Sequence, residues 1–217
     1  MTGQLAFDLP ALQAFRREDF FPSPANAVAL AALLDPTARR LMLVGPHGAG
    51  KTHLAHIWAG VAGAHLLPLT DLPHALPDLS PDAAVVIDNA DDPARDQTAL
   101  FHLHNLLAPS GRLLLTATTP PRDWGLTLPD LVSRLQAMTH LTLDAPDDAL
   151  LSAVLVKLFA DRQIAVPPNL IPYLVTRMER SIAAARALVA TLDAAALAQG
   201  RPVTRALAAE LLDIREC

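Results

Sequence analysis

Residues 45–52 have the residue types and the spacing of a phosphate-binding loop: a glycine, four variable residues, then glycine, lysine and threonine. Glycines let a backbone pass close to an anion, and the N–H groups at the start of a following helix attract phosphate. The lysine can reach the outer phosphates, and the threonine hydroxyl can ligate Mg²⁺. The pattern predicts a site for a nucleoside di- or triphosphate, whose ligands are Gly45, Pro46, His47, Gly48, Ala49, Gly50, Lys51 and Thr52.

An acidic residue at the end of a second apolar run completes this predicted site. Residues 83–87 are apolar and of strand length, and they end at Asp88, which is expected to hold Mg²⁺ through water, together with the loop threonine. The next residue, Asn89, can orient a water molecule but cannot accept its proton, so slow intrinsic hydrolysis is expected. Asp91 and Asp92 lie beyond the strand end and are expected to be solvated.

The elements that must position these residues alternate along the first two thirds of the chain. After a helix at residues 26–34, short apolar runs predict strands at residues 41–44, 65–67, 83–87, 112–116 and 140–143. Helical patterns separate them at residues 53–61, 97–107 and 129–135, while the Pro-rich stretch 68–81 is expected to be irregular. This alternation predicts an α/β fold, with a five-stranded parallel sheet flanked by helices and the ligand at the carboxyl ends of the strands.

A small all-helical domain is expected after this sheet. Helical patterns occupy residues 147–162, 168–178, 182–199 and 204–214, with Pro or Gly between them and no strand pattern. The predicted organisation is an N-terminal tail at residues 1–22, a nucleotide-binding α/β domain at 23–144 and a helical lid at 145–217.

Composition excludes several classes of function. The chain has 217 residues, of which 52% are hydrophobic, and a net charge of −5, which argues against binding DNA broadly through its backbone. The one cysteine, Cys217, rules out a disulfide framework, and no apolar run of membrane-spanning length or targeting signal is evident. A cytoplasmic protein is expected. The histidines are not expected to bind a metal, because no cysteines or matching acids accompany them.

Several segments together resemble the DnaA family of AAA+ ATPases. They are the phosphate-binding loop, residues 101–107, the sensor-like strand and double-proline turn at 114–121, and the arginine-finger-like segment at 128–135. The resemblance implies that Phe21, in residues 20–26, lies over adenine and that Thr118 is the sensor residue, where relatives usually carry an acid. It also implies that Arg134 acts in trans on a neighbour's nucleotide. The alternative is a surface arginine paired with Asp130 or with the loop around Asp123.

The second sensor of the family is less well matched. The segment beginning at Arg177 places Ala183 where the family has a nucleotide-contacting arginine. Arg180 and Arg186 lie one turn to either side, so both are candidates for that contact. With Asn89, these departures favour a nucleotide that acts as a conformational ligand. ADP or ATP with Mg²⁺ is implied, with ADP favoured by the resemblance.

The N-terminal residues resemble the short peptide by which replication proteins dock on the DNA sliding clamp. Gln4 would hydrogen-bond, and Leu5, Phe7 and Leu9 would enter an apolar pocket. Because the chain has no room for the DNA-binding domain of DnaA, sequence-specific DNA binding is not expected. The resemblance is closest to the regulatory inactivators of DnaA and implies two partners: DnaA, whose bound ATP would be hydrolysed, and the clamp, the polymerase beta subunit.

Other functions stay open on the same module. A helicase loader or another replication adaptor would bind a helicase instead, and an autonomous ATPase motor would turn over ATP by itself. A DNA-binding initiator is disfavoured by the acidic charge. Whether the protein forms a homo-oligomer is left open by the sequence.

Overall fold

The α/β part of the protein is built on one five-stranded sheet in which every strand is parallel to its neighbours. The computed structural model describes residues 21–24 and 26–213. The strand order is β2–β3–β4–β1–β5, and the bounds are β1 (Arg40–Val44), β2 (His65–Leu67), β3 (Ala84–Ile87), β4 (Arg112–Ala117) and β5 (Thr139–Thr142). The central strands β3 and β4 are buried along almost their whole length, because helices cover both faces of the sheet. The predicted fold class is confirmed.

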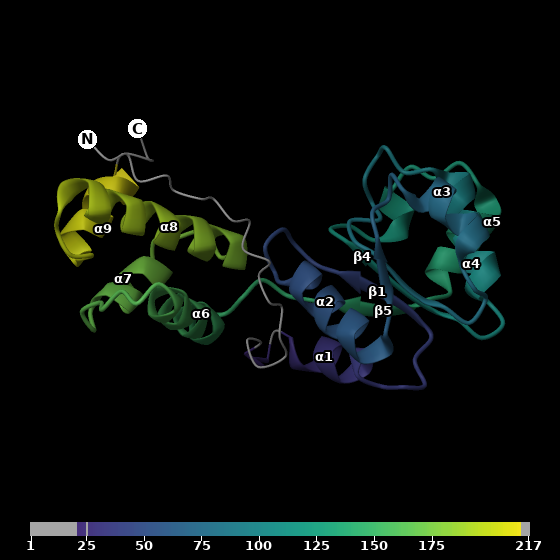
Figure 1. The fold of residues 1–217 in the computed structure, drawn as a ribbon, viewed down its shortest axis with the longest axis horizontal. Helices are drawn as coiled ribbons and strands as arrows, with labels where there is room; N and C mark the ends of the chain where they lie inside the picture. The colour runs from purple at the N-terminus through teal and green to yellow at the C-terminus, as the bar shows by residue number, and fades with distance from the viewer. Residues whose placement is uncertain (1–20, 25, 214–217) are drawn as a thin grey trace, which may run out of the picture.

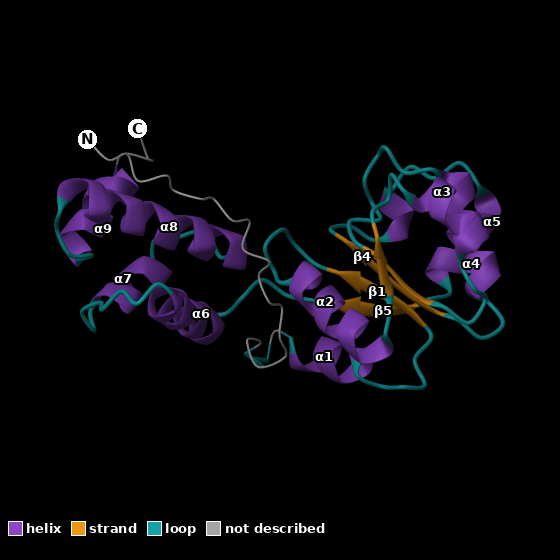
Figure 2. Ribbon diagram, viewed as in Figure 1, coloured by secondary structure: helices purple, strands orange, loops and turns teal. Residues whose placement is uncertain are grey.

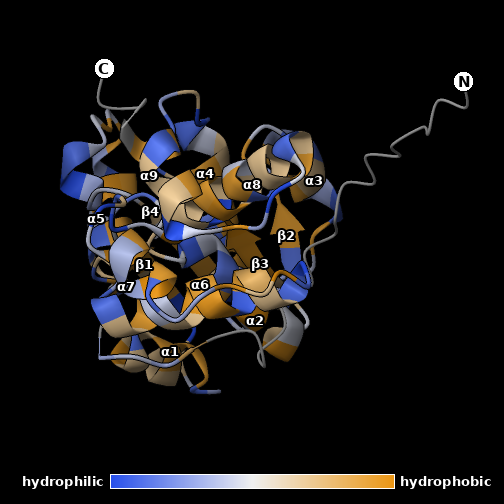
Figure 3. Ribbon diagram, turned by 90° about the vertical axis from the view of Figure 1, so that its left-hand side faces the viewer, coloured by the Kyte–Doolittle hydropathy of each residue, from blue (hydrophilic) through white to orange (hydrophobic). Residues whose placement is uncertain are grey.

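Two separate apolar layers hold the helices against the sheet (Figure 1). On one face, α1 (Ala27–Leu33) and α2 (Lys51–Ala62) pack around Trp58 and Leu54. On the other face lie α3 (Leu72–Ala75), α4 (Gln97–Leu107) and α5 (Pro129–Gln136). Figure 2 shows the strands enclosed between these two sets of helices. The strand β3 is coloured as hydrophobic in Figure 3, as expected for a strand covered in this way.

The remaining helices form a bundle with its own core at one end of the molecule (Figure 1). They are α6 (Asp148–Asp161), α7 (Leu170–Val175), α8 (Ile182–Gln199) and α9 (Arg205–Asp213). Phe159 and Leu192 are among the residues at the centre of this core. A short segment that includes the buried Pro146 joins the bundle to β5.

No apolar run long enough to span a membrane was expected from the sequence, and α8 is an exception. By length and composition alone, α8 could cross a membrane, and it is the one such helix in the part of the chain that the structure describes. Its apolarity has a different cause, because Ala185, Leu188, Val189 and Leu192 are buried in the core of the helical bundle.

Local differences from the sequence predictions have local causes. Within the stretch expected to be irregular, α3 and a 3₁₀ turn at Leu76–Asp78 form, since a proline near the start of each does not interrupt helical hydrogen bonds. Asn26 immediately precedes α1, but its side chain does not cap the helix and is bonded to the residues before it. It accepts a bond from the Ser23 N–H (2.8 Å) and donates to the Phe21 carbonyl (3.0 Å).

Candidate nucleotide-binding site

The phosphate-binding loop joins the end of β1 to the start of α2, as expected. Gly48 and Gly50 have φ values of +70° and +103°, a region in which side chains with a Cβ are strained. α2 begins at Lys51, so the unpaired N–H groups of its first turn lie at the loop. The local backbone therefore has the form that an anion site needs.

The loop lysine is buried and is bonded to the loop itself. The Lys51 ammonium donates to the carbonyls of Gly45 (2.8 Å) and Pro46 (2.9 Å). Burial lowers the pKa of Lys51, and the negative charges of Asp88 and Asp91 oppose that shift. A bound phosphate would replace the two carbonyl partners and would stabilise the charged form of the lysine.

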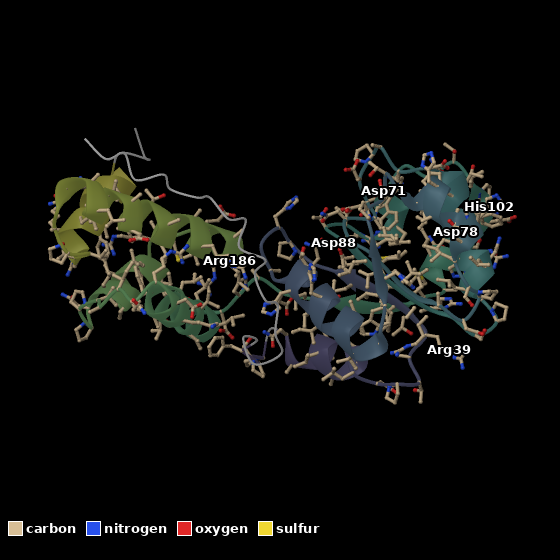
Figure 4. The ribbon with its side chains drawn as sticks, in the orientation of Figure 1. Arg39, Asp71, Asp78, Asp88, His102 and Arg186 are labelled. Atoms are coloured by element: carbon tan, nitrogen blue, oxygen red, sulfur yellow. The ribbon has the colours of Figure 1, made fainter. Side chains whose placement is uncertain are left out.

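The predicted metal ligands lie in contact. The Thr52 hydroxyl donates to Asp88 across 2.8 Å, and the second carboxylate oxygen of Asp88 accepts from the hydroxyl of Thr116 on β4. Figure 4 shows Asp88 at the edge of the sheet. Hydroxyl and carboxylate oxygens fit Mg²⁺, which keeps several waters and binds substrate phosphates. Among the described residues, no group of three or more His, Cys, Asp or Glu side chains could hold a metal alone, so phosphate oxygens would complete the shell.

The residue after Asp88 has an unusual backbone conformation. Asn89 has a φ of +54°, and its N–H donates to the Thr116 hydroxyl (3.0 Å). Asparagine is one of the few residues that tolerate this region of φ. Its exposed side chain is an amide and can orient a water molecule, but it offers no base for hydrolysis.

Asp91 was expected to be solvated, and that expectation is wrong. Its carboxylate accepts from the N–H of Thr118 (2.7 Å), from the Thr118 hydroxyl and from the N–H of Thr119 (3.3 Å). Burial acts to raise the pKa of Asp91, but these hydrogen bonds outweigh it and the net shift is downward. The predicted sensor residue Thr118 is therefore bonded to a carboxylate that comes from the turn after β3.

Arg95 and Trp124 extend this network, and no sequence motif pointed to Arg95. The Arg95 guanidinium donates to the carbonyls of Asp91 (3.1 Å), Asp92 (2.8 Å) and Trp124, and lies 5.6 Å from the centre of the Trp124 ring. The Trp124 indole N–H donates to the carbonyl of Thr119 (2.8 Å). The turn after β3 is thus fixed to the turn after β4. Only the adjacency of these strands in the sheet could have identified Arg95.

The start of α8 closes over the phosphate-binding loop. The Ile182 N–H donates to the Gly48 carbonyl (2.8 Å), and a Cβ built on Gly48 would lie 1.9 Å from the hydroxyl oxygen of Ser181. Ser181 is buried and caps the helix by accepting from the N–H of Ala184. Ala183 lies at the same contact, because its N is 3.4 Å from that Cβ position.

The two arginines proposed for the second sensor have different surroundings. Arg180 pairs with Asp148 of α6 (2.7 Å), and both side chains are largely exposed. Arg186 is partly buried, and burial lowers its pKa. Figure 4 shows Arg186 on the helical bundle, on the far side of the phosphate-binding loop from Asp88. Neither assignment is tested by these contacts.

Arg134 lies at the opposite edge of the sheet from this site. It is in the last turn of α5, which ends just before β5 begins, and its guanidinium carbon is 5.3 Å from the centre of the Phe101 ring on α4. Together with Arg40, the first residue of β1, it helps to lower the pKa of the buried His104 to about 4, although burial is the largest cause. Across the described residues, Arg134 forms no ion pair with Asp130, and Arg122 pairs with Asp123 instead.

Two further sets of predicted contacts involve the N-terminal part of the chain. Phe21 is partly buried at the start of the described chain, next to α1, and its contact with adenine stays a prediction. The clamp-binding residues Gln4, Leu5, Phe7 and Leu9 lie outside the described residues.

No family model matches this chain. Among solved structures, domain III of the Thermotoga maritima replication initiation protein DnaA is similar, with a TM-score of 0.78 and 17% identity, over 92% of this chain and 95% of that one. The chain has the fold of an AAA+ P-loop NTPase module. DnaA from Aquifex aeolicus bound to AMPPCP has a TM-score of 0.68 and 15% identity over 81% of this chain, which spans 64% of that structure. The Thermotoga maritima RuvB Holliday junction branch migration motor has a TM-score of 0.66 and 18% identity, over 87% of this chain and 65% of that one.

Proposed function

We propose that this protein is a regulator of replication initiation of the Hda type, the regulatory inactivator of DnaA. It would bind ADP or ATP with Mg²⁺ in its own P-loop, dock on the sliding clamp, and stimulate hydrolysis of DnaA-bound ATP. This would leave inactive DnaA-ADP and prevent re-initiation. A cytoplasmic location follows from these partners.

The position of Arg134 is the observation that carries this proposal. The P-loop follows the carboxyl end of β1, whereas Arg134 lies near its amino end, beside Arg40 and His104. A five-residue strand separates these ends by roughly 13 Å. Arg134 therefore cannot reach a nucleotide in its own P-loop, and a role in hydrolysis requires the nucleotide of another subunit. There a guanidinium would stabilise the charge that develops on the γ-phosphate.

The protein's own site supports a regulator more than a motor. Asn89 replaces the carboxylate that would accept a proton from water, and Ala183 stands at the contact between α8 and the P-loop. The fold is also similar to that of a branch-migration motor, RuvB, so the fold alone does not choose between these functions. The chemistry of the site favours a nucleotide that is bound and slowly hydrolysed.

The first test replaces the proposed arginine finger. Arg134→Ala is expected to lower the stimulation of DnaA-ATP hydrolysis, assayed with clamp loaded on DNA, by about 10³-fold or more. Arg122→Ala is the matched control, because Arg122 is exposed, lies in the segment that precedes α5 and pairs only with Asp123 among the described residues. Equal stimulation by the unaltered and Arg134→Ala proteins would contradict the finger assignment.

The second test separates docking from activation. Deletion of residues 4–9 is expected to abolish co-purification with the clamp, whereas Arg134→Ala is expected to leave it intact. A protein that captures the replicative helicase, and neither DnaA nor the clamp, would instead be a helicase loader or another replication adaptor.

A further inference from the structure

Two arginines of the helical bundle lie over the same aromatic ring, at the end of the molecule that the bundle forms (Figure 1). The guanidinium carbons of Arg177, in the turn after α7, and Arg205, the first residue of α9, are 4.2 Å and 4.8 Å from the centre of the Tyr173 ring. Tyr173 is partly buried and packs against the core of the bundle, which fixes its ring. The ring therefore holds two positive charges at most about 9 Å apart, where they repel each other.

These two arginines differ from most other cations of the bundle in having no carboxylate partner. Both are exposed, and neither forms an ion pair with any residue that the structure describes. Arg177 donates to the Thr176 hydroxyl (3.1 Å). Their N–H donors are thus open to an anion from outside the chain. Other cations of the bundle are paired within it, as Lys157–Asp161, Arg162–Asp193, Arg180–Asp148 and Arg201–Glu210.

The surroundings of the pair favour a nucleic-acid backbone over an acidic peptide. A guanidinium can form two parallel hydrogen bonds with either a phosphate or a carboxylate. A peptide usually also needs an apolar anchor, and no large exposed apolar side chain of the described residues lies in α7, in the turn after it or at the start of α9. A nucleic-acid backbone needs none, because the release of its counterions supplies binding free energy. The large exposed apolar side chains lie elsewhere and are Val28, Val61, Leu66, Val156 and Leu197.

The aromatic ring distinguishes a duplex from a single strand. Proteins that bind single strands stack unpaired bases on open aromatic rings. The Tyr173 ring packs against the bundle core and carries two guanidiniums, so it is poorly placed to stack on a base. The phosphates of a duplex can be contacted without any stacking.

We propose that Arg177 and Arg205 form a contact site for the phosphodiester backbone of duplex DNA. Contacts of this kind position a protein on a duplex without reading its sequence. The net charge of −5 restricts the contact to this patch and makes it sensitive to salt. The inference goes beyond the proposed function and depends neither on Arg134 nor on a bound nucleotide.

The experiment measures binding of the full chain to a fluorescently labelled DNA duplex of mixed sequence, by anisotropy over a series of salt concentrations. Arg177→Ala combined with Arg205→Ala is expected to weaken binding by about tenfold at low salt. The slope of log affinity against log salt concentration is expected to fall by about 2, because two phosphate contacts are lost. Arg162→Ala combined with Arg201→Ala is the matched control, because it removes the same charge from guanidiniums of the same bundle that are paired with carboxylates.

A charge-preserving variant keeps the test valid if the alanine variant weakens the fold. Arg177→Lys combined with Arg205→Lys keeps both charges and is expected to keep the salt slope of the unaltered protein. Failure of the unaltered protein to bind the duplex, or equal losses in the alanine variant and the matched control, would overturn the inference. Tighter binding of polyglutamate than of the duplex at the same salt concentration would also overturn it, in favour of an acidic protein surface. The test uses neither DnaA nor the clamp, so its failure would leave the proposed function standing.

Discussion

The two edges of the central sheet differ in how their charged residues are arranged. At the carboxyl edge, hydrogen bonds to nearby loops and strands hold Lys51, Thr52 and Asp88, and the start of α8 contacts the adjacent Gly48. At the amino edge, Arg134 rests on an aromatic ring, and a neutral histidine lies near it. Side chains that hydrogen bonds hold in place, as at the carboxyl edge, suit a ligand that enters the site. A guanidinium that lies against a ring can still donate through its N–H groups, which suits a ligand held by another molecule.

This contrast implies that the two edges can be disabled independently. Lys51→Ala removes the ammonium that would bind the outer phosphates and is expected to weaken nucleotide binding by about 100-fold. Arg134→Ala is expected to leave the same dissociation constant unchanged, as measured by calorimetry with ADP. If both variants weakened binding equally, the separation between the edges would be refuted.

The contact of α8 with the P-loop distinguishes the carboxyl edge further. In Gly48→Ala the new Cβ would overlap the Ser181 side chain at a φ of +70°, and the free energy of unfolding is expected to fall by about 2–3 kcal/mol. Gly60→Ala is the control, because Gly60 lies within α2 with no atom within 4 Å of the new Cβ, and it is expected to stabilise by about 0.5–1 kcal/mol. Urea unfolding measures both. Equal effects would mean that α8 does not constrain the loop.

The buried His104 gives the amino edge its own dependence on pH. Its pKa is about 4 in the folded protein, against 6.5 ordinarily, because of burial and the charges of Arg40 and Arg134. Between these values the unfolded chain binds a proton that the folded protein does not, so stability is lost as pH falls from about 6.5 to about 4. The loss is expected to be about 3 kcal/mol. His104→Gln should remove this dependence in urea unfolding, whereas His102→Gln, at an exposed position, should retain it.

The pKa of His104 also gives a test of where Arg134 lies. Because the Arg134 charge contributes to the low pKa of His104, Arg134→Ala is expected to raise that pKa in an NMR titration. An unchanged pKa would place Arg134 away from the amino edge and would weaken the argument for action in trans.

The sequence predicted the elements better than the contacts between them. The strand at His65–Leu67 and the helices at Gln97–Leu107 and Ile182–Gln199 have their predicted bounds, because apolar periodicity and capping act over neighbouring residues. The bond from Asp91 to Thr118 depends on the adjacency of β3 and β4 in the sheet. The bond from Ile182 to Gly48 depends on how the helical bundle packs. Neither is encoded by local spacing.

The last feature of the carboxyl edge concerns ATP hydrolysis, for which the site lacks a base. The carboxyl edge lacks a base next to Asp88, and Asn89→Asp would supply one with almost no change of shape in a conformation that Asp also tolerates. Intrinsic ATP hydrolysis is expected to rise by about tenfold, measured as phosphate release under single-turnover conditions. Asn169→Asp makes the same chemical change at the start of α7 and should have no effect. If Asn89→Asp hydrolysed ATP no faster, the missing carboxylate would not be what limits the reaction, and the position of α8 over the P-loop would become the next candidate.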